Sequence, residues 1–309
     1  MVYIKYMEMR HIRYFLAVKE TKSFTRAAER LNIAQPPLSM QIRDLEVEVG
    51  ARLFNRSVQG TQLTEAGKVF YESVKDLPER FTQAIETAQR AEMGITGLLR
   101  LGFTGSTGIN PRVPAFIQHY RERYPSVQLH ISEASTEELC RALKDGHIDV
   151  AMLRTHGELQ GDFTTVLLEN EPLVAVFPKS HPAALHSDSL SLSTLRNDPF
   201  ILSMVEQGTS LHGAIINACN SEGFIPNVIM TVPHILSILT LVASGVGVSL
   251  VPSSMKAFSL PGIAFRELKE NTATVGLSIS WREGEMCPTA KNFVDLLVRQ
   301  PNWGNSSYD

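Results

Sequence analysis

The stretch from Ser23 to Val49 constrains the fold of this chain more than any other part of its 309 residues. Its apolar residues recur at the three- and four-residue spacing of a buried helix face, first at Phe24, Ala27, Ala28 and Leu31, then at Leu38, Ile42, Leu45 and Val49. Pro36 and Pro37 fit only the first turn of a helix, where an N–H group has no helical partner, so they place the start of the second helix. The pattern predicts two short helices joined by a tight turn.

Two such helices have the geometry of a helix-turn-helix, in which the second helix enters the major groove of DNA by its N-terminal residues. That end offers the amide of Gln35, which can read a base edge, and the hydroxyl of Ser39, which can reach a base or a phosphate. The row opposite the apolar one consists of Pro36, Ser39, Met40 and Arg43. Taken alone, the pattern fits a helical hairpin in an unrelated core equally well, because amphipathic helix pairs are common.

The longer pattern around these helices resembles the LysR-type bacterial transcriptional regulators. The matching residues begin before the helix pair and continue after it: Phe15, Ala17, Val18, Ser23, Phe24, Thr25, Ala27, Ala28, Leu31, Gln35, Pro36, Leu38, Ser39, Gln41, Ile42, Leu45, Glu46, Gly50, Leu53, Phe54 and Arg56. The segment IAQPPLS resembles in particular the branch that controls degradation of aromatic compounds. Met40 departs from the resemblance, because many members of the family have Arg there.

The resemblance implies three parts: an all-α winged helix-turn-helix at 7–65, a linker helix for dimerisation at 66–94, and an effector-binding domain at 95–309. The last is expected to be α/β and similar to periplasmic binding proteins, with lobe I at about 97–168 and 274–309 and lobe II at about 169–273. The expected DNA contacts are Phe24, Thr25, Arg26, Gln35, Pro36, Pro37, Ser39, Met40, Arg43 and Arg56. Arg56 and the wing tip would hold phosphates without reading the sequence.

Charge is distributed unevenly along the chain. Its net charge is −3, yet residues 1–66 hold ten Lys and Arg against seven Asp and Glu, a net of +3 that leaves −6 for the remainder. A basic head on an acidic body is typical of a DNA-binding module attached to another domain. Cys140, Cys219 and Cys287 form no CxxC pair and are expected to be reduced, as in a cytoplasmic protein. No apolar run approaches the roughly 18 residues of a membrane helix.

An apolar seam after Thr64 predicts a long helix that needs a partner. The seam consists of Phe70, Val74, Leu77, Phe81, Ile85 and Ala88. The resemblance implies that this helix pairs two subunits, and that dimers assemble into tetramers. Pro78 lies inside the predicted helix and is expected to kink it.

From Leu98 onward, apolar runs alternate with helical stretches, which predicts an α/β domain with parallel sheets. The predicted strands are 98–103, 127–131, 148–153, 172–177 and 246–251, and the predicted helices are 111–123, 136–144, 210–222 and 233–243. The polar stretch 154–162 is expected to cross into a second lobe.

The segment LGFTGSTG at 101–108 predicts a strand that runs into a glycine- and hydroxyl-rich turn, where N–H groups with Ser106 and Thr107 could hold an anion. The alternative is a purely structural turn. The resemblance implies an effector cleft lined by Ser106, Thr107, Thr136, Gln207, Gly208 and Thr209. Arg154 follows an apolar strand and is either a partner for the effector's carboxylate or the partner of a neighbouring Glu.

Enzymatic and metal-binding functions have weaker support. Asp145, His147 and Asp149 spell D-x-H-x-D, which could ligate a metal, but the family resemblance explains Gly146 and Asp149 as a common turn and strand start. We expect no metal, no other cofactor and no catalytic residues. The sequence predicts a cytoplasmic transcriptional regulator that binds double-stranded operator DNA, RNA polymerase and a small organic acid, aromatic or ring-cleavage-derived. The alternatives are a solute-binding protein and a small-molecule α/β enzyme.

Overall fold

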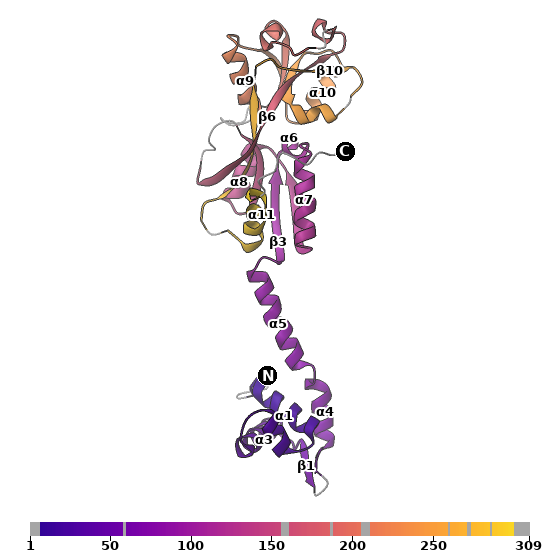
Figure 1. Ribbon diagram of the computed structural model, residues 1–309, viewed down its shortest axis with the longest axis vertical. Coiled ribbons are helices and arrows are strands. Elements are labelled where there is room, and N and C mark those ends of the chain that lie inside the picture. The colour runs from indigo at the N-terminus through magenta and orange to yellow at the C-terminus, as the bar shows by residue number, and fades with distance from the viewer. Residues whose placement is uncertain are drawn as a thin grey trace. The chain divides into compact units, whose positions relative to one another are not determined.

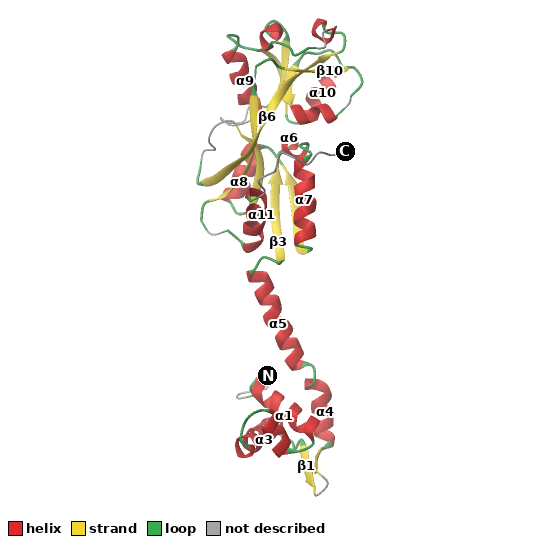
Figure 2. Ribbon diagram, viewed as in Figure 1, coloured by secondary structure: helices red, strands yellow, loops and turns green. Residues whose placement is uncertain are grey.

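The computed structural model describes residues 7–57, 60–155, 161–185, 188–204, 211–258, 260–270, 273–284 and 286–299. The chain divides into two compact units, residues 1–89 and 90–309 (Figure 1). The first unit is mainly helical, and the second combines helices with sheets (Figure 2).

The first unit consists of helices and a two-stranded wing. Its elements are α1 (Met9–Thr21), α2 (Phe24–Arg30), α3 (Gln35–Val49), β1 (Phe54–Ser57), β2 (Gly60–Leu63) and α4 (Glu65–Val74). The two strands pair antiparallel, with Phe54 opposite Leu63 and Ser57 opposite Gly60. This arrangement confirms the predicted winged helix-turn-helix.

Local sequence explains where the paired helices begin. Ser23 caps α2, because its side chain accepts a hydrogen bond from the backbone N–H of Arg26 at 3.4 Å. Asn32 takes the left-handed conformation in the turn, with φ 54°, which a short polar side chain tolerates. Pro36 and Pro37 lie in the first turn of α3, as predicted. Ser23, Asn32 and the two prolines each favour the backbone conformation found at their position, and together they set the geometry of the helix pair and its turn.

The core of the first unit contains most of both predicted apolar rows. Phe15 lies at its centre, with ring centroids 5.1 Å from both Phe54 of the wing and Phe70 of α4. Gly67 is required in α4, because a Cβ atom there would lie 2.1 Å from the carbonyl oxygen of Leu53. The wing and α4 are therefore fixed to the helix pair by direct packing.

The linker differs from its prediction. In place of one long helix kinked at Pro78, α4 ends at Val74 and a separate helix, α5 (Leu77–Glu92), follows a short turn. Pro78 lies in the first turn of α5, where its missing N–H costs no helical hydrogen bond, so it begins a helix instead of bending one.

The predicted apolar seam is divided by this break. Phe70, Val74 and Leu77 pack on the core of the first unit. Phe81 and Ile85 on α5 are 53% and 45% exposed. Within the described chain, only this second part of the seam is available to another molecule.

The second unit has two lobes that share one long strand, β6 (Phe163–Pro178). The strands of the first lobe are β3 (Thr96–Phe103), β4 (Ser126–Glu133), β5 (Val150–Thr155), the first part of β6, and β11 (Thr274–Arg282). β3 pairs parallel with β4 and β5, whereas β11 pairs antiparallel with β5 and β6. The sheet is therefore mixed, not parallel as predicted, because β6 and β11 do not follow crossover helices.

Helices cover both faces of this first sheet. They are α6 (Gly105–Gly108), α7 (Arg112–Arg123), α8 (Thr136–Lys144) and α11 (Pro288–Val298). Phe116 of α7 and Phe293 of α11 meet edge to face in one core, with ring centroids 4.9 Å apart. Leu139 and Leu143 of α8 form a separate core with residues of β5.

The second lobe contains the remainder of β6 and four further strands. Its elements are the short helix η1 (Pro182–Leu185), η2 (Leu192–Leu195), β7 (Pro199–Ser203), α9 (Leu211–Ser221), β8 (Asn227–Val232), α10 (Ile235–Ala243), β9 (Ser249–Pro252), η3 (Ser253–Ala257) and β10 (Ile263–Glu267). β9 and β10 pair with β6, and β7 pairs parallel with β8. The predicted helices of both lobes are present within two residues of their expected bounds.

The chain crosses between the lobes inside β6. Residues 163–172 of this strand pair with β11, whereas residues 173–178 pair with β9 and β10. The crossing expected at 154–162 is wrong, since β5 and the start of β6 belong to the same sheet. The lobe boundary expected at about 168/169 falls inside β6. Glu171 lies at the true crossing.

Candidate functional site

The exposed side of the helix pair carries most of the residues that the sequence assigned to DNA. Those exposed to solvent are Thr25 and Arg26 on α2 and Gln35, Pro36, Pro37, Met40 and Arg43 on α3. Met40 is 56% exposed, so its side chain is available on this face. Arg56 lies in β1 opposite Thr61, and its side chain is outside the described part of the chain.

Phe24 does not belong to this exposed group. Its side chain is 8% exposed, and its ring meets that of Phe54 edge to face at 5.8 Å. The apolar row that contains Phe24 turns it toward the core, so the expected DNA contact at this residue is corrected to a packing role.

Ser39 also differs from its expected position on the exposed row, because it is only 9% exposed. Its Oγ accepts a hydrogen bond from Nε2 of Gln35 at 3.0 Å. The two residues are one helical turn apart, a spacing that brings side chains together. Ser39 therefore orients the amide of Gln35, a residue that is itself exposed.

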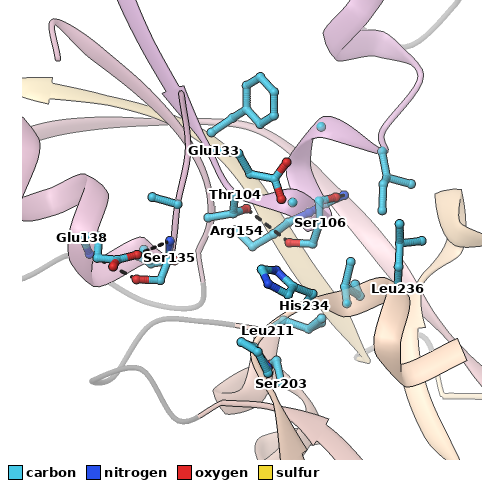
Figure 3. Close-up of a pocket in the computed structure, with 18 residues that line it drawn as sticks. Thr104, Ser106, Glu133, Ser135, Glu138, Arg154, Ser203, Leu211, His234 and Leu236 are labelled. Carbon is cyan, nitrogen blue, oxygen red and sulfur yellow. Dashed lines mark hydrogen bonds between the residues drawn. The ribbon is translucent and has the colours of Figure 1, made fainter. Parts of the chain in front are cut away.

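In the second unit, a cleft of about 660 Å³ is lined by residues of both lobes. Figure 3 shows the side chains that converge on it from the turn after β3, the start of α8, the end of β5 and the start of α10. Of the residues predicted for the effector, Ser106, Thr136 and Arg154 line the cleft. Gln207, Gly208 and Thr209 lie outside the described residues.

Thr107 does not line the cleft, contrary to its prediction. It is fully buried, and its hydroxyl lies 2.8 Å from the hydroxyl of Thr104. Thr104 in turn accepts backbone hydrogen bonds from Thr107 and Gly108 through its carbonyl oxygen. Thr104 and Thr107 thus hold the turn, and Ser106 is the hydroxyl that it presents to the cleft.

The start of α8 forms a second polar wall. Ser135 accepts a hydrogen bond from the N–H of Glu138, and the Glu138 carboxylate accepts one from the N–H of Ser135 at 3.0 Å. This hydrogen bond from the Ser135 backbone, with one from its hydroxyl, lowers the pKa of Glu138 from its ordinary value. Glu138 is therefore held as a helix cap at the edge of the cleft.

Arg154 is buried at the base of the cleft, with 1% of its surface exposed. Its Nη2 donates to the Oε2 atom of Glu171 at 2.6 Å and to the carbonyl oxygen of Ser106 at 3.0 Å. The partner is therefore a neighbouring Glu, one of the two roles that the sequence left open. Nε and Nη1 have no hydrogen-bond partner among the described residues.

Glu171 joins residues of both lobes. It accepts from the amide of Asn110 at 3.0 Å in the first lobe and from the N–H of Ser254 at 2.6 Å in the second. Burial alone would raise the pKa of Glu171, but the Arg154 charge and the hydrogen bonds from Ser254 bring it below its ordinary value. The carboxylate is therefore charged and bound on both sides of the crossing.

Sequence reasoning missed several residues of the cleft. Glu133, Leu211, His234 and Leu236 line it and come from three different stretches of the chain, the end of β4 and the starts of α9 and α10. Their own segments were predicted as strand ends and helix starts, but no local pattern indicates that residues about 100 positions apart share one cavity. The crossing inside β6 brings the two lobes that carry them together.

The D-x-H-x-D motif has a structural explanation. Both oxygens of Asp149 bind Arg100, with 2.6 Å between Oδ1 and Nη2. Within the described residues, no group of three or more His, Cys, Asp and Glu is arranged to hold a metal ion. Nor is any helix of the described chain long and apolar enough to cross a membrane.

Comparison with known proteins gives matches over both units. Residues 9–68 match the family described as bacterial regulatory helix-turn-helix protein, lysR family, and residues 93–302 match the LysR substrate binding domain. The transcriptional regulator AlsR of Bacillus subtilis is 34% identical over 94% of this chain and 95% of its own length. The transcriptional regulator CatR of Pseudomonas putida is 35% identical over 95% of this chain and 99% of its own length. The structure of full-length CbnR complexed with its target DNA has a TM-score of 0.82 at 26% identity, covering 95% of this chain and 99% of that one.

Proposed function

Because the chain belongs to the LysR family of DNA-binding transcriptional regulators, we propose that it binds double-stranded operator DNA and that a small organic acid controls its activity. The exposed residues of α2 and α3 read the DNA, and the cleft of the second unit holds the acid. The observation that carries the proposal is the exposed N-terminal half of α3, where Gln35, Pro36, Pro37 and Met40 have no role in packing.

The polar groups of the cleft suit an acid. Ser106 presents a hydroxyl, and Thr136 opens α8 at the edge of the cleft, with the N-terminus of the helix directed to it. The remaining walls are largely apolar and include Phe103, Leu211 and Leu236. Hydroxyl and N–H groups donate the hydrogen bonds that a carboxylate accepts, and the apolar walls suit the hydrocarbon body of an organic acid.

The class of acid is a narrower proposal. The segment IAQPPLS favours an aromatic or ring-cleavage-derived acid, by its resemblance to regulators of aromatic degradation. Identity to CatR and to AlsR is nearly equal, at 35% and 34%, so overall likeness does not choose between these relatives. To control activity, the acid must bind one arrangement of the two lobes more tightly than the other. A ligand shifts the equilibrium between two conformations only by the difference between its affinities for them.

The exposed part of the linker supports a dimer that could assemble into a tetramer. Phe81 and Ile85 lie one turn apart on α5, and a second copy of this helix would cover them. A dimer presents two helix-turn-helix motifs to two half-sites of one operator. We propose that the protein acts in the cytoplasm with RNA polymerase as its partner, without enzymatic activity.

A gel shift with the DNA upstream of the protein's own coding sequence tests the proposed function. Specific retardation at physiological salt, with competition by the same but not by unrelated DNA, is the expected result. A thermal-shift screen with aromatic acids and ring-cleavage diacids tests the cleft, since a ligand that binds the native state raises its apparent stability. Failure to prefer the upstream DNA, together with binding of acids, would favour a solute-binding protein.

A further inference from the structure

We propose that His234 is the cationic partner of the effector's carboxylate, so that binding of the acid takes up a proton. This inference rests on the proposed function, because it assumes that the cleft holds an acid. It adds a residue of the second lobe to a site whose predicted polar contacts lie mainly in the first. The argument depends on the position of the imidazole and on the charges around it.

The position of His234 is set by a buried helix. It is the residue before α10, in an extended conformation, and it makes no side-chain hydrogen bond to the helix end. The helix is anchored by Ile235, Ile238 and Val242, which are at most 7% exposed. The imidazole itself is exposed and projects into the cleft (Figure 3), without a hydrogen bond or ion pair to any described residue.

The other charged groups that line the cleft supply no unbalanced positive charge. The charge of Arg154 is balanced by Glu171, although its Nε and Nη1 have no partner among the described residues and can donate to a ligand, and Glu133 and Glu138 are negative. No Lys is among the described lining residues. A carboxylate that leaves water for this cleft therefore meets two like charges, and it needs a compensating positive charge or strong hydrogen bonds. Among the described lining residues, His234 can supply a positive charge that is not already paired with a carboxylate.

The elements packed against α10 leave His234 without an internal ion partner. β7 and β8 carry no titratable residue. The charged residues of the other two strands are engaged elsewhere: Glu169 with Arg112, Glu171 with Arg154, Glu267 with Lys256, and Arg266 with the carbonyl oxygens of Ala184 and Phe265. His212 at the start of α9 lies 2.8 Å from the carbonyl oxygen of Ser203 through Nδ1. The ring of His234 is thus available to a ligand.

An acid held in this way would join the lobes. Its carboxylate would accept from Ser106 in the first lobe and from protonated His234 in the second, while Leu211 and Leu236 contact its apolar body. A carboxylate bound beside an imidazole favours the protonated ring. Affinity for the acid should therefore rise as the pH falls.

The test is calorimetry on the full-length chain at pH 6.0 and 8.0 with benzoate, hexanoate and cis,cis-muconate, and with benzamide as a neutral analogue. Buffers of different ionisation enthalpy report the protons taken up. We expect at least one acid to bind about ten- to a hundredfold more tightly at pH 6.0 than at pH 8.0, and to take up close to one proton when it binds at pH 8.0. His234→Gln should remove both effects, whereas His234→Lys should bind the same acid with little dependence on pH.

The matched control is His147→Gln, because His147 is also exposed and does not line the cleft. This variant should keep the affinity and pH dependence of the unmodified protein. If an acid binds and His234→Gln preserves its affinity and proton uptake, the inference is wrong and the proposed function stands. If no acid binds at either pH while DNA is still bound, the acid-sensing part of the proposed function fails, and the inference fails with it.

Discussion

Nη2 of Arg154 lies 2.6 Å from Oε2 of Glu171 at the strand that crosses between the two lobes. Both side chains are buried, and Glu171 also binds Asn110 and Ser254 on opposite sides of the crossing. Breaking a buried ion pair is far more costly than replacing both partners, because the remaining charge has neither water nor a counterion. Removal of one partner alone should therefore destabilise the two-lobed unit.

We predict that Glu171→Ala destabilises the second unit by about 3–5 kcal/mol, whereas Arg154→Met with Glu171→Leu in the same chain costs less. Denaturant unfolding followed by circular dichroism measures both. Because the folded pKa of Glu171 is lowered, its contribution should be complete above the ordinary glutamate value of 4.5 and should disappear as the pH falls below it. Equal costs for the single and double variants would contradict this account.

Phe24 offers a test of its corrected role. Phe24→Ala removes a buried ring that packs on Phe54, so we predict a loss of about 3–5 kcal/mol in the free energy of unfolding of the first unit. Thr25→Ala, at the exposed neighbouring position, should change this free energy by less than about 0.5 kcal/mol. Thermal unfolding of both variants decides the matter. An unchanged melting temperature in Phe24→Ala, with loss of DNA binding, would restore the original assignment.

The errors of the sequence prediction in the first unit and the linker have separate causes. Periodicity found α2, α3 and the helices of the second unit, because each buries one face of regular spacing. Periodicity placed Phe24 on a buried helix face, whereas the family resemblance placed it among the DNA contacts, because a family pattern does not say which residues support a DNA contact and which make it. Periodicity also missed that Pro78 begins a helix, because a proline fits the first turn of a helix as well as it disrupts the interior.

The cleft was harder to predict than the fold. Ser106 and Thr136 follow strand ends, where ligands commonly bind in α/β domains, so local pattern and resemblance sufficed for them. His234 and Leu236 belong to a helix start in the other lobe, and their place depends on the crossing inside β6. That crossing leaves no local signal, since residues 163–178 form one uninterrupted strand.

The hydrogen bond from Gln35 to Ser39 predicts coupled effects on DNA recognition. Gln35→Ala should relax base discrimination by roughly 1–3 kcal/mol, because an amide that reads a base edge is lost. Ser39→Ala should give a smaller loss of the same kind, since the amide of Gln35 then lacks its support. The double variant should be no worse than Gln35→Ala alone.

Competition gel shifts with the upstream DNA and with single-base variants of it provide the measurement. Thr25→Ser is a suitable control for general disturbance of the exposed face, because it keeps a hydroxyl at a neighbouring exposed position. Additive losses in the double variant would show that Ser39 contacts DNA independently of Gln35. That outcome would return Ser39 to the role that the sequence first gave it.

The last prediction concerns the exposed part of the linker. Phe81→Asp places a charge at a position that a partner helix would cover, and burying an unpaired charge costs several kcal/mol. The dimer should therefore dissociate at concentrations where the unmodified protein remains paired, while the melting temperature of each unit is preserved. Leu77→Asp is the informative contrast, since Leu77 packs on the core of the first unit and its replacement should lower that unit's own stability. Sedimentation equilibrium measures the first effect and calorimetry the second. An undisturbed dimer in Phe81→Asp would place the subunit contact elsewhere than on this face of α5.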